Sequence, residues 1–250
     1  MDYRFLLHEL VMKGIRLKYR RSYLGIVWSL IEPVLTTIVL VIVFGTLFGN
    51  KKENFPLYII TGRLLYTFFQ NGTKAACTSI RANASMIKKV YVPKYMYPLA
   101  AVLFNFIIFL ISMIVLVLVD IYCKVIPTWR VLWILPALFI LMLMTIGVGM
   151  CLATLNVFFR DIEYLWNVGL MMIMYMSAIF YYPERIMASG YAWLLQYNPL
   201  YQVIMMCRCA VMGDPVDLGG ILYALIFSIL ITVIGFVVFK KKQDEFILHI

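Results

Sequence analysis

The sequence predicts an all-α integral membrane protein with six transmembrane helices. Hydrophobic residues make up 64% of its 250 residues and charged residues only 14%, whereas a soluble domain is nearer half apolar and a quarter charged. Apolar runs long enough to cross a bilayer, which takes about 20 residues, recur along the chain. The basic residues gather in alternate connecting segments, as expected when those segments stay cytoplasmic.

The N-terminal segment, residues 1–22, is predicted to form a cytoplasmic amphipathic interface helix. Apolar residues recur at helical spacing between residues 3 and 20, and such a helix lies along a membrane rather than across it. Because the first ten residues contain no apolar core before a small-residue cleavage site, we expect the first membrane helix itself to direct insertion. The polar face carries Lys13, Arg16, Arg20 and Arg21.

The transmembrane domain is predicted to span residues 23–243 and to be followed by a cytoplasmic tail, residues 244–250. Glu32 lies near the start of the first membrane helix, where an acid can contact a substrate or can snorkel to the interface. The predicted membrane helices cover residues 26–48, 57–79, 97–121, 132–157, 164–182 and 218–239.

The second predicted membrane helix is the most polar of the six. Arg63, Gln70, Asn71 and Lys74 all interrupt its apolar sequence. A helix exposed to lipid would not tolerate that set, so this helix must face protein, a cavity or water. It is the first indication of a polar path through the membrane.

Residues 184–212 are too broken to form one spanning helix. Two short apolar segments, 184–195 and 199–212, flank Asn198–Pro199. Apolar segments of about 10–14 residues are typical of re-entrant or interfacial helices. We therefore expect a re-entrant pair between the fifth and sixth membrane helices.

The distribution of charge sets the predicted orientation. Of the 22 Lys and Arg residues, 14 fall in segments assigned to the cytoplasm and 6 in segments assigned to the outside, Arg208 among the latter. The net charge of +10 is then explained by basic loops that bind the anionic inner leaflet of the membrane. Binding to nucleic acid is not needed to explain it. The protein is predicted to be a multi-pass protein of the bacterial cytoplasmic membrane, with both termini cytoplasmic.

The motifs that usually carry catalysis are missing from the sequence. It contains no Gly-x4-Gly-Lys-[Ser/Thr] P-loop, no His-Glu-x-x-His and no Gly-x-Ser-x-Gly, and its only histidines are His8 and His249. Its five cysteines show no Cys-x-x-Cys spacing. We therefore predict no catalytic residue, metal or cofactor in this chain, so that uphill transport would need energy from a partner.

Four motifs give the chain a resemblance to a known family. They are Tyr19–Gly25 with Trp28 and Pro33 after it, the stretch from Asn83 to Pro93, Phe158–Ile162, and Asn198–Leu200. In this order they resemble the membrane subunit of bacterial ABC-2 type polysaccharide exporters, a family that moves lipid-linked O-antigens, teichoic acids and related glycans. The resemblance covers nearly the whole chain.

The resemblance implies a homodimer with two separate ABC ATPase subunits, which would bind MgATP. It also implies that residues 82–93 form a coupling helix seated on the ATPase, and that the N-terminal helix contacts the same subunit. A merely basic inner loop would also follow from the positive-inside bias alone. The coupling residues would be Asn83, Met86, Ile87, Lys88, Lys89, Val90, Tyr91 and Pro93.

The resulting prediction is the transmembrane subunit of an ATP-driven exporter of a lipid-linked polysaccharide. An ABC-2 permease for a drug or small lipid is the alternative, and a non-transport enzyme or scaffold would need clustered catalytic residues or a soluble domain. Aromatic rings stack on the apolar faces of sugars and so can line a conduit, although aromatic residues at the interfaces are expected in any membrane protein. The lining candidates are Tyr23, Trp28, Tyr66, Phe69 and Tyr175.

Overall fold

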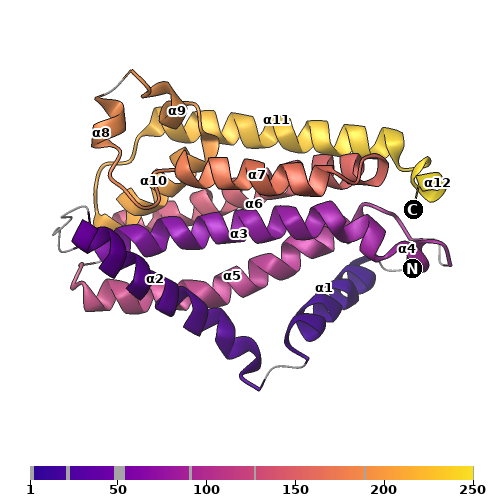
Figure 1. Ribbon diagram of the computed structural model, residues 1–250, viewed down its shortest axis with the longest axis horizontal. Coiled ribbons are helices and arrows are strands. Elements are labelled where there is room, and N and C mark those ends of the chain that lie inside the picture. The colour runs from indigo at the N-terminus through magenta and orange to yellow at the C-terminus, as the bar shows by residue number, and fades with distance from the viewer. Residues whose placement is uncertain are drawn as a thin grey trace.

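The protein is a bundle of long helices that run side by side, and every regular element in the described residues is helical (Figure 1). The longer helices are α1 (Tyr3–Tyr19), α2 (Trp28–Leu47), α3 (Phe55–Ala82), α5 (Met96–Tyr122), α6 (Ile134–Phe158), α7 (Ile162–Tyr175), α10 (Pro199–Met212) and α11 (Leu218–Lys242). The computed structural model describes residues 3–20, 23–47, 54–89, 92–126, 128–188 and 190–249.

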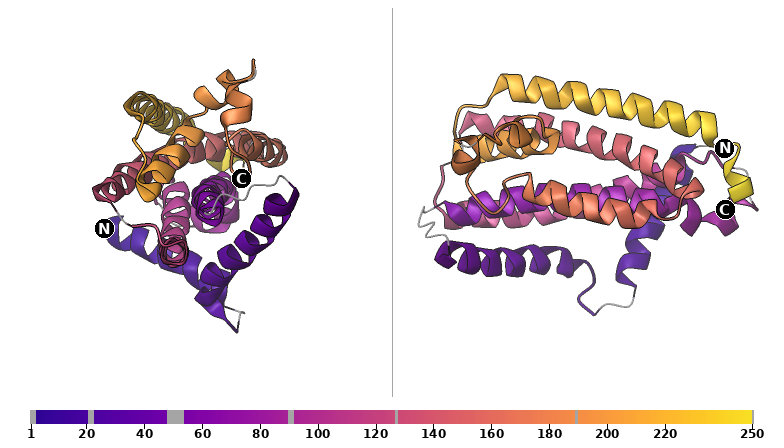
Figure 2. Two further views of the ribbon diagram at one scale, coloured as in Figure 1. Left: turned by 90° about the vertical axis from the view of Figure 1, so that its left-hand side faces the viewer. Right: turned by 45° about the horizontal axis from the view of Figure 1, so that its top comes forward.

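Helix α3 is the centre of the bundle. It packs against α2, α5, α6, α7 and α10, and a view along the bundle shows it surrounded by the other helices (Figure 2). Leu57, Ile60 and Tyr66 are among its fully buried residues. Such close side-chain packing is what holds helices together in a bilayer, where lipid tails are as apolar as leucine.

Helices α6 and α11 pack closely along their length, and glycines make that approach possible. An alanine Cβ at Gly235 would lie 2.6 Å from the carbonyl oxygen of Gly147. One at Gly147 would lie 2.6 Å from the backbone nitrogen of Thr232. The Thr232 hydroxyl donates a hydrogen bond of 2.9 Å to the carbonyl of Leu143 across the same contact. Small residues at such crossings let two backbones meet.

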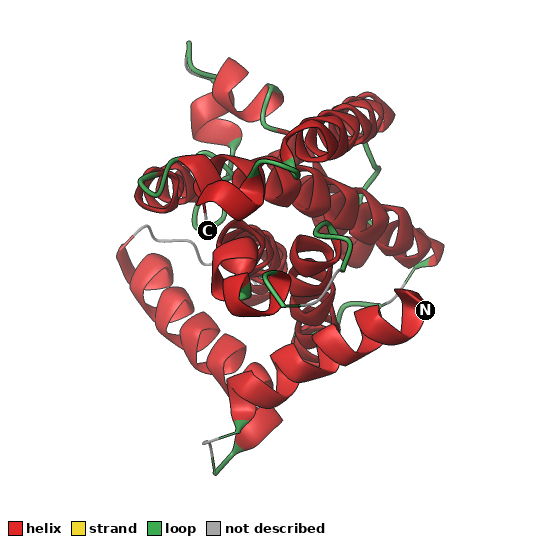
Figure 3. Cartoon of the chain, turned by 90° about the vertical axis from the view of Figure 1, so that its right-hand side faces the viewer, coloured by secondary structure: helices red, strands yellow, loops and turns green. Residues whose placement is uncertain are grey.

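Both termini lie at one end of the bundle, which we call the terminal end (Figures 1 and 3). The short helices α4 (Ala84–Ile87) and α12 (Phe246–His249) lie there too. The predicted tail therefore contains a packed helix, because Phe246 is fully buried against Phe158 and Phe239.

The predicted coupling helix is much shorter than residues 82–93, since α4 has only four residues. Asn83 separates α4 from α3, and its amide group donates a hydrogen bond of 2.9 Å to the carbonyl of Ser79. Lys88 and Lys89 form a turn, and Pro93 further on has no N–H to continue a helix. Val90 and Tyr91 lie outside the described residues.

At the opposite end of the bundle α7 stops at Tyr175, earlier than the predicted 182. The carbonyls that follow accept hydrogen bonds from side chains of α3 and α10 instead of from helical N–H groups, and Ala178 has a positive φ of 47°. The predicted helix 184–195 is two separate turns, α8 (Glu184–Met187) and α9 (Trp193–Gln196). Asn198 then caps α10, because its side-chain oxygen accepts hydrogen bonds from the next two N–H groups after Pro199.

Four helices in the described part of the chain are long and apolar enough to cross a membrane. Helices α7 and α10 have 14 residues each, so each is too short to cross about 30 Å of hydrocarbon unaided. The chain is thus a membrane protein, while six crossings stay a prediction. The four segments are Gly25–Gly45, Met96–Tyr122, Trp129–Phe158 and Leu218–Lys242.

Candidate functional site

A stripe of polar residues runs along α3, the central helix. Arg63, Thr67, Asn71, Lys74 and Thr78 are spaced by four, four, three and four residues, which puts them on one face of an α-helix. All five are at least partly exposed, whereas most residues between them are buried. The sequence predicted that this helix faces protein, a cavity or water, and all five residues line cavities.

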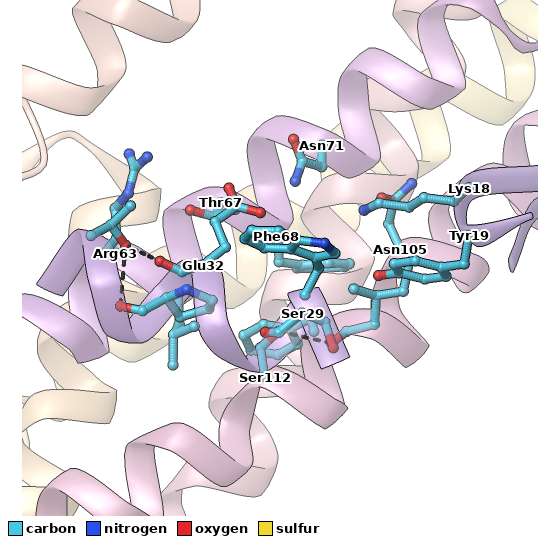
Figure 4. Close-up of a pocket in the computed structure, with 16 residues that line it drawn as sticks. Lys18, Tyr19, Ser29, Glu32, Arg63, Thr67, Phe68, Asn71, Asn105 and Ser112 are labelled. Carbon is cyan, nitrogen blue, oxygen red and sulfur yellow. Dashed lines mark hydrogen bonds between the residues drawn. The ribbon is translucent and has the colours of Figure 1, made fainter. Parts of the chain in front are cut away.

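The first cavity along this stripe lies between α2, α3, α5 and the end of α1 (Figure 4). It holds about 100 Å³. Lys18 reaches it from α1, Glu32 from α2, and Asn105 from α5. In Figure 4 the side chain of Lys18 extends toward Asn71 of α3. An element outside the predicted membrane helices therefore contributes a cation to a cavity built within them.

A second cavity, of about 350 Å³, continues the first toward the terminal end. Lys18, Asn71 and Asn105 line both cavities. The second adds Lys74 from α3 and Asn167 from α7 to the lining. The two cavities are therefore neighbours along the polar face of α3.

A third cavity, of about 440 Å³, continues the first toward the opposite end and shares Arg63 with it. Its other walls are almost entirely apolar, from Leu35 and Val39 of α2 to Met174 and Phe180. The three cavities are neighbours that share lining residues along α3, and we call them together the polar groove. Its polar lining includes Lys18, Glu32, Arg63, Thr67, Asn71, Lys74, Thr78, Asn105, Glu163 and Asn167.

Lys18 of α1 and Glu32 of α2 carry opposite charges and line the same cavity. Removal from water lowers the pKa of Lys18, and the Glu32 carboxylate acts in the opposite direction. The sequence allowed Glu32 either a contact role or a snorkelling role, and the structure places it in the cavity lining. The Ser112 hydroxyl donates a hydrogen bond of 2.8 Å to the carbonyl of Ser29 and so ties α5 to α2 beside the cavity.

The predicted aromatic lining residues fall in three environments. Tyr66 and Phe69 belong to the buried core: the Tyr66 hydroxyl donates to the carbonyl of Leu170 at 2.8 Å, and Phe69 packs edge-on against a tryptophan of α7. Trp28 lines the first cavity. Tyr23 and Tyr175 are exposed on the surface of the single chain.

At the terminal end, α1 and α4 enclose a basic hollow of about 500 Å³. Lys13, Arg16 and Arg20 line one side, and Met86 lines the other. Residues predicted separately as interface-helix and coupling residues are therefore brought together in space. The remaining interface residue, Arg21, lies outside the described residues.

The predicted coupling residues divide into buried and exposed sets. Ile87 is buried in a cluster with Val92 and Phe246, so it points into the bundle. Lys88 and Lys89 are exposed beside it. We call the exposed surface formed by the hollow together with Ser85, Lys88 and Lys89 the basic platform.

Sequence reasoning assigned Arg208 to a segment on the outer side of the membrane, and the structure shows that this arginine is buried within the helix bundle. Its side chain is only 1% exposed. It donates hydrogen bonds to the carbonyls of Tyr58, Ala178 and Ile179 at 3.2, 3.0 and 3.3 Å. The signal was available, because an arginine within an apolar helix segment must find internal partners.

In the described part of the chain, no three His, Cys, Asp or Glu residues lie close enough together to hold a metal ion. The arrangement instead joins a polar groove within apolar helices to a basic platform at one end. A fold of this kind defines a polytopic membrane protein with a path for a polar molecule.

The chain belongs to the ABC-2 type transporter family, whose pattern matches residues 6–212. It is 28% identical over 242 residues to the O-antigen export system permease protein RfbA of Klebsiella pneumoniae, covering 96% of this chain and 93% of that protein. It is 26% identical over 204 residues to the RfbA protein of Myxococcus xanthus, covering 81% and 78%. It is 21% identical over 248 residues to the polysialic acid transport protein KpsM of Escherichia coli, covering 94% and 92%.

Proposed function

We propose that this chain is the transmembrane subunit of an ATP-driven exporter that moves a lipid-linked polysaccharide across the bacterial cytoplasmic membrane. Its family is that of ABC-2 type transporters, and relatives aligned over nearly their whole length are named as O-antigen export permeases. The observation that carries the proposal furthest is the polar groove along α3. A hydrophilic polysaccharide that crosses a bilayer needs a polar surface of this kind between the apolar helices.

The conduit itself would form between two copies of the chain. The polar stripe of α3 is open on the side between α2 and α7, where the third cavity lies. Next to that opening α7 carries exposed apolar residues at helical spacing, among them Leu165, Val168 and Met172. A second copy covering this side would turn two open grooves into one closed path.

The orientation follows from charge. The basic platform and the lysines that end α11 share the terminal end, and basic segments stay on the cytoplasmic side. Both termini would then be cytoplasmic. Helix α10 and the turns α8 and α9 would form the re-entrant region at the outer side. Helices α2, α3, α5, α6, α7 and α11 would make the six crossings.

The energy would come from two ABC ATPase subunits that bind MgATP and dock on the basic platform. Lys88 and Lys89 offer exposed cations beside α4, and α4 rests on the core through Ile87. A push on α4 would reach α1, since Met86 of α4 and Leu10 of α1 pack against the same buried cluster. At its other end α1 carries Lys18 into the polar groove.

Charge reversal on the platform tests this proposal. We would co-express the chain with the ABC ATPase encoded beside it, purify through a tag on this chain, and measure the amount of ATPase recovered. We expect Lys88→Glu with Lys89→Glu to abolish recovery. Lys240→Glu with Lys241→Glu makes the same charge change at the same end, on the exposed end of α11, and should leave recovery intact. Failure of the wild type to retain any ATPase would refute the proposal.

A further inference from the structure

Two aromatic rings stack beside the third cavity of the polar groove. This cavity is lined by Leu40 of α2 and by Phe180, which follows the end of α7. Phe44 lies four residues after Leu40 on α2, about one helical turn further along. Its ring stacks on the ring of Phe180, with 5.2 Å between the ring centres and 12° between the planes. The stack therefore lies next to the cavity that is farthest from the terminal end.

Beyond the stack the bundle is filled with apolar and aromatic side chains. Phe44 packs on a cluster formed by Phe55, Tyr58 and Ile59 at the start of α3, and each of these three residues is at most 4% exposed. Tyr182 packs on the same cluster, with its ring centre 4.5 Å from that of Tyr58. An ion that left the third cavity in this direction would have to part the two stacked rings.

The charged lining of the groove ends before the stack. Figure 4 shows Lys18 and Arg63 at opposite sides of the first cavity, and Arg63 is the one charged residue that also lines the third. The hydroxyl of Thr36, which lines both cavities, donates to the carbonyl of Glu32 at 2.8 Å within α2. From Arg63 to Phe180 the groove thus becomes apolar, and apolar constrictions stop ions by expelling water.

The backbone on both sides of Phe180 is held by side chains from other helices. The Tyr58 hydroxyl donates to the carbonyls of Ala178 and Tyr181 at 3.0 and 2.9 Å. Arg208 donates to the carbonyls of the two residues that precede Phe180, at 3.0 and 3.3 Å. One residue of α3 and one of α10 therefore fix the position from which the Phe180 side chain reaches Phe44.

We propose that Phe44 and Phe180 form a hydrophobic seal that closes the polar groove to ions and water, and that Tyr58 and Arg208 are positioning residues that hold Phe180 in this seal. The inference rests on the proposed function and names the residues that keep a resting exporter from leaking. A path polar enough for a glycan would also conduct ions, which the membrane potential drives across the bilayer.

The seal accounts for two costly features of this region. An arginine within membrane helices is costly and marks a functional site by default, and Arg208 is 1% exposed. Ala178 has a φ of 47°, a left-handed conformation that is strained for a residue with a side chain. Both features belong to the short segment that presents Phe180 to Phe44.

Ion leak through the resting protein tests the seal. We would reconstitute the full chain, with the ATPase that it retains and without nucleotide, into liposomes that hold a dye quenched by iodide. We expect iodide to enter wild-type liposomes within roughly twofold of the protein-free rate, and roughly tenfold faster with Phe44→Ala or with Phe180→Ala, because water can then fill the gap. Phe180→Trp keeps a large ring and should stay sealed.

Phe106→Ala is the matched control, because it removes the same ring from an aromatic pair that does not line the groove, 5.4 Å from the ring centre of Phe68. Its iodide rate should equal that of the wild type. A wild-type rate in both Phe44→Ala and Phe180→Ala, or an equal leak in Phe106→Ala, would overturn the proposal. Elution volume and helical circular dichroism show which variants are folded, and the two seal variants are tested separately so that either one suffices.

The charge next to the seal shows whether the leak passes through the groove. Because Arg63 lines the third cavity together with Phe180, an opened seal should favour iodide over potassium. In the Phe180→Ala background, Arg63→Gln should lower the ratio of iodide flux to potassium flux roughly threefold. An unchanged ratio would mean that the ions pass elsewhere, which contradicts the seal.

The positioning role of Tyr58 has its own matched pair. Tyr58→Phe keeps the ring and removes the hydroxyl that holds the backbone around Phe180, and we expect iodide to enter roughly threefold faster. Tyr66→Phe also removes a buried hydroxyl that donates to a carbonyl, that of Leu170 at 2.8 Å, but at a distance from the seal. It should lower the unfolding midpoint without a leak, and equal leaks in the two variants would refute the positioning role.

Recovery of the ATPase is measured on the same preparations, so that two kinds of failure can be told apart. If the ATPase is retained but Phe44→Ala and Phe180→Ala stay sealed, only the seal is wrong. If no ATPase is retained, the proposed function falls, and iodide entry through the chain alone still shows whether the two rings close the groove.

Discussion

The guanidinium carbon of Arg208 lies 3.4 Å from the centre of the Tyr58 ring. The same guanidinium donates to the carbonyl of Tyr58, and both side chains donate to the carbonyl of Ala178. A cation–π contact and a shared acceptor therefore join α10 to α3 at the break after α7. In the described residues, the partners of Arg208 are carbonyls, a sulfur atom and an aromatic ring, with no carboxylate. The planar guanidinium group donates to several of these partners at once, and this stabilises the arginine in its buried position.

Replacing Arg208 should destabilise the protein strongly. Arg208→Met removes the side-chain donor to the buried carbonyls of Tyr58 and Ile179 and one of the two donors to the carbonyl of Ala178, and we expect a loss of about 2–4 kcal/mol. Arg208→Lys should restore little of this, because an ammonium cannot reach three separate carbonyls in one plane. The measurement is the thermal unfolding midpoint in one detergent. Arg160→Met, at an exposed position, is the control, and an equal shift there would contradict the assignment.

Gly62 should accept no side chain, because it faces the same arginine. An alanine Cβ at this position would lie 2.5 Å from a terminal nitrogen of Arg208. Gly62→Ala should therefore displace the guanidinium and cost roughly 1–3 kcal/mol through overpacking. Gly45 is also helical and has nothing within 4 Å of an added Cβ, so Gly45→Ala should be neutral or slightly stabilising. Equal midpoints for the two variants would show that the arginine can move aside.

The contact between α6 and α11 should be as sensitive to an added methyl group as the contact of Gly62 with Arg208. Gly235→Ala would push a methyl group against the carbonyl oxygen of Gly147, which is backbone and cannot turn away. We expect a lowered unfolding midpoint and a loss of roughly 1–3 kcal/mol. At Gly169 on α7 the nearest atom to an added Cβ is 3.7 Å away, and Gly169→Ala should be tolerated. A wild-type midpoint for Gly235→Ala would mean that the two helices can separate without cost.

The C-terminal helix should support the basic platform from inside. Phe246 is fully buried and belongs to the same cluster as Ile87, so Phe246→Ala opens a cavity beneath α4. We expect it to cost about 3 kcal/mol and to reduce recovery of the ATPase. Leu248 is 83% exposed, and Leu248→Ala should change neither quantity. Retention of the ATPase by Phe246→Ala at wild-type levels would show that α4 does not depend on this cluster.

The same cluster explains which platform substitutions are informative. A charge at Ile87 would unfold the terminal end, since the side chain points into the bundle. Loss of the ATPase in an Ile87→Asp variant would thus say nothing about a docking surface. Lys88 and Lys89 are exposed and can be changed without disturbing the core.

The membrane class, the helix periodicity and the polar character of α3 were all determined by the sequence alone. These features depend on local composition: a run of about 20 apolar residues predicts a spanning helix wherever it packs, and Arg63 and Lys74 in such a run require a polar environment. The bounds of α10 agree with the predicted 199–212, because Asn198 and Pro199 form a local helix start.

Only the tertiary structure decided which residues face the groove and which face the core. Tyr66 lies three residues from Arg63 in the sequence, yet it is buried against α7 while Arg63 lines two cavities. The end of α7, the burial of Arg208 and the inward face of Ile87 likewise depend on partners far away in the chain. A helix sequence shows which residues share a face, but the neighbours that cover that face are brought there by packing between helices, which local periodicity does not encode.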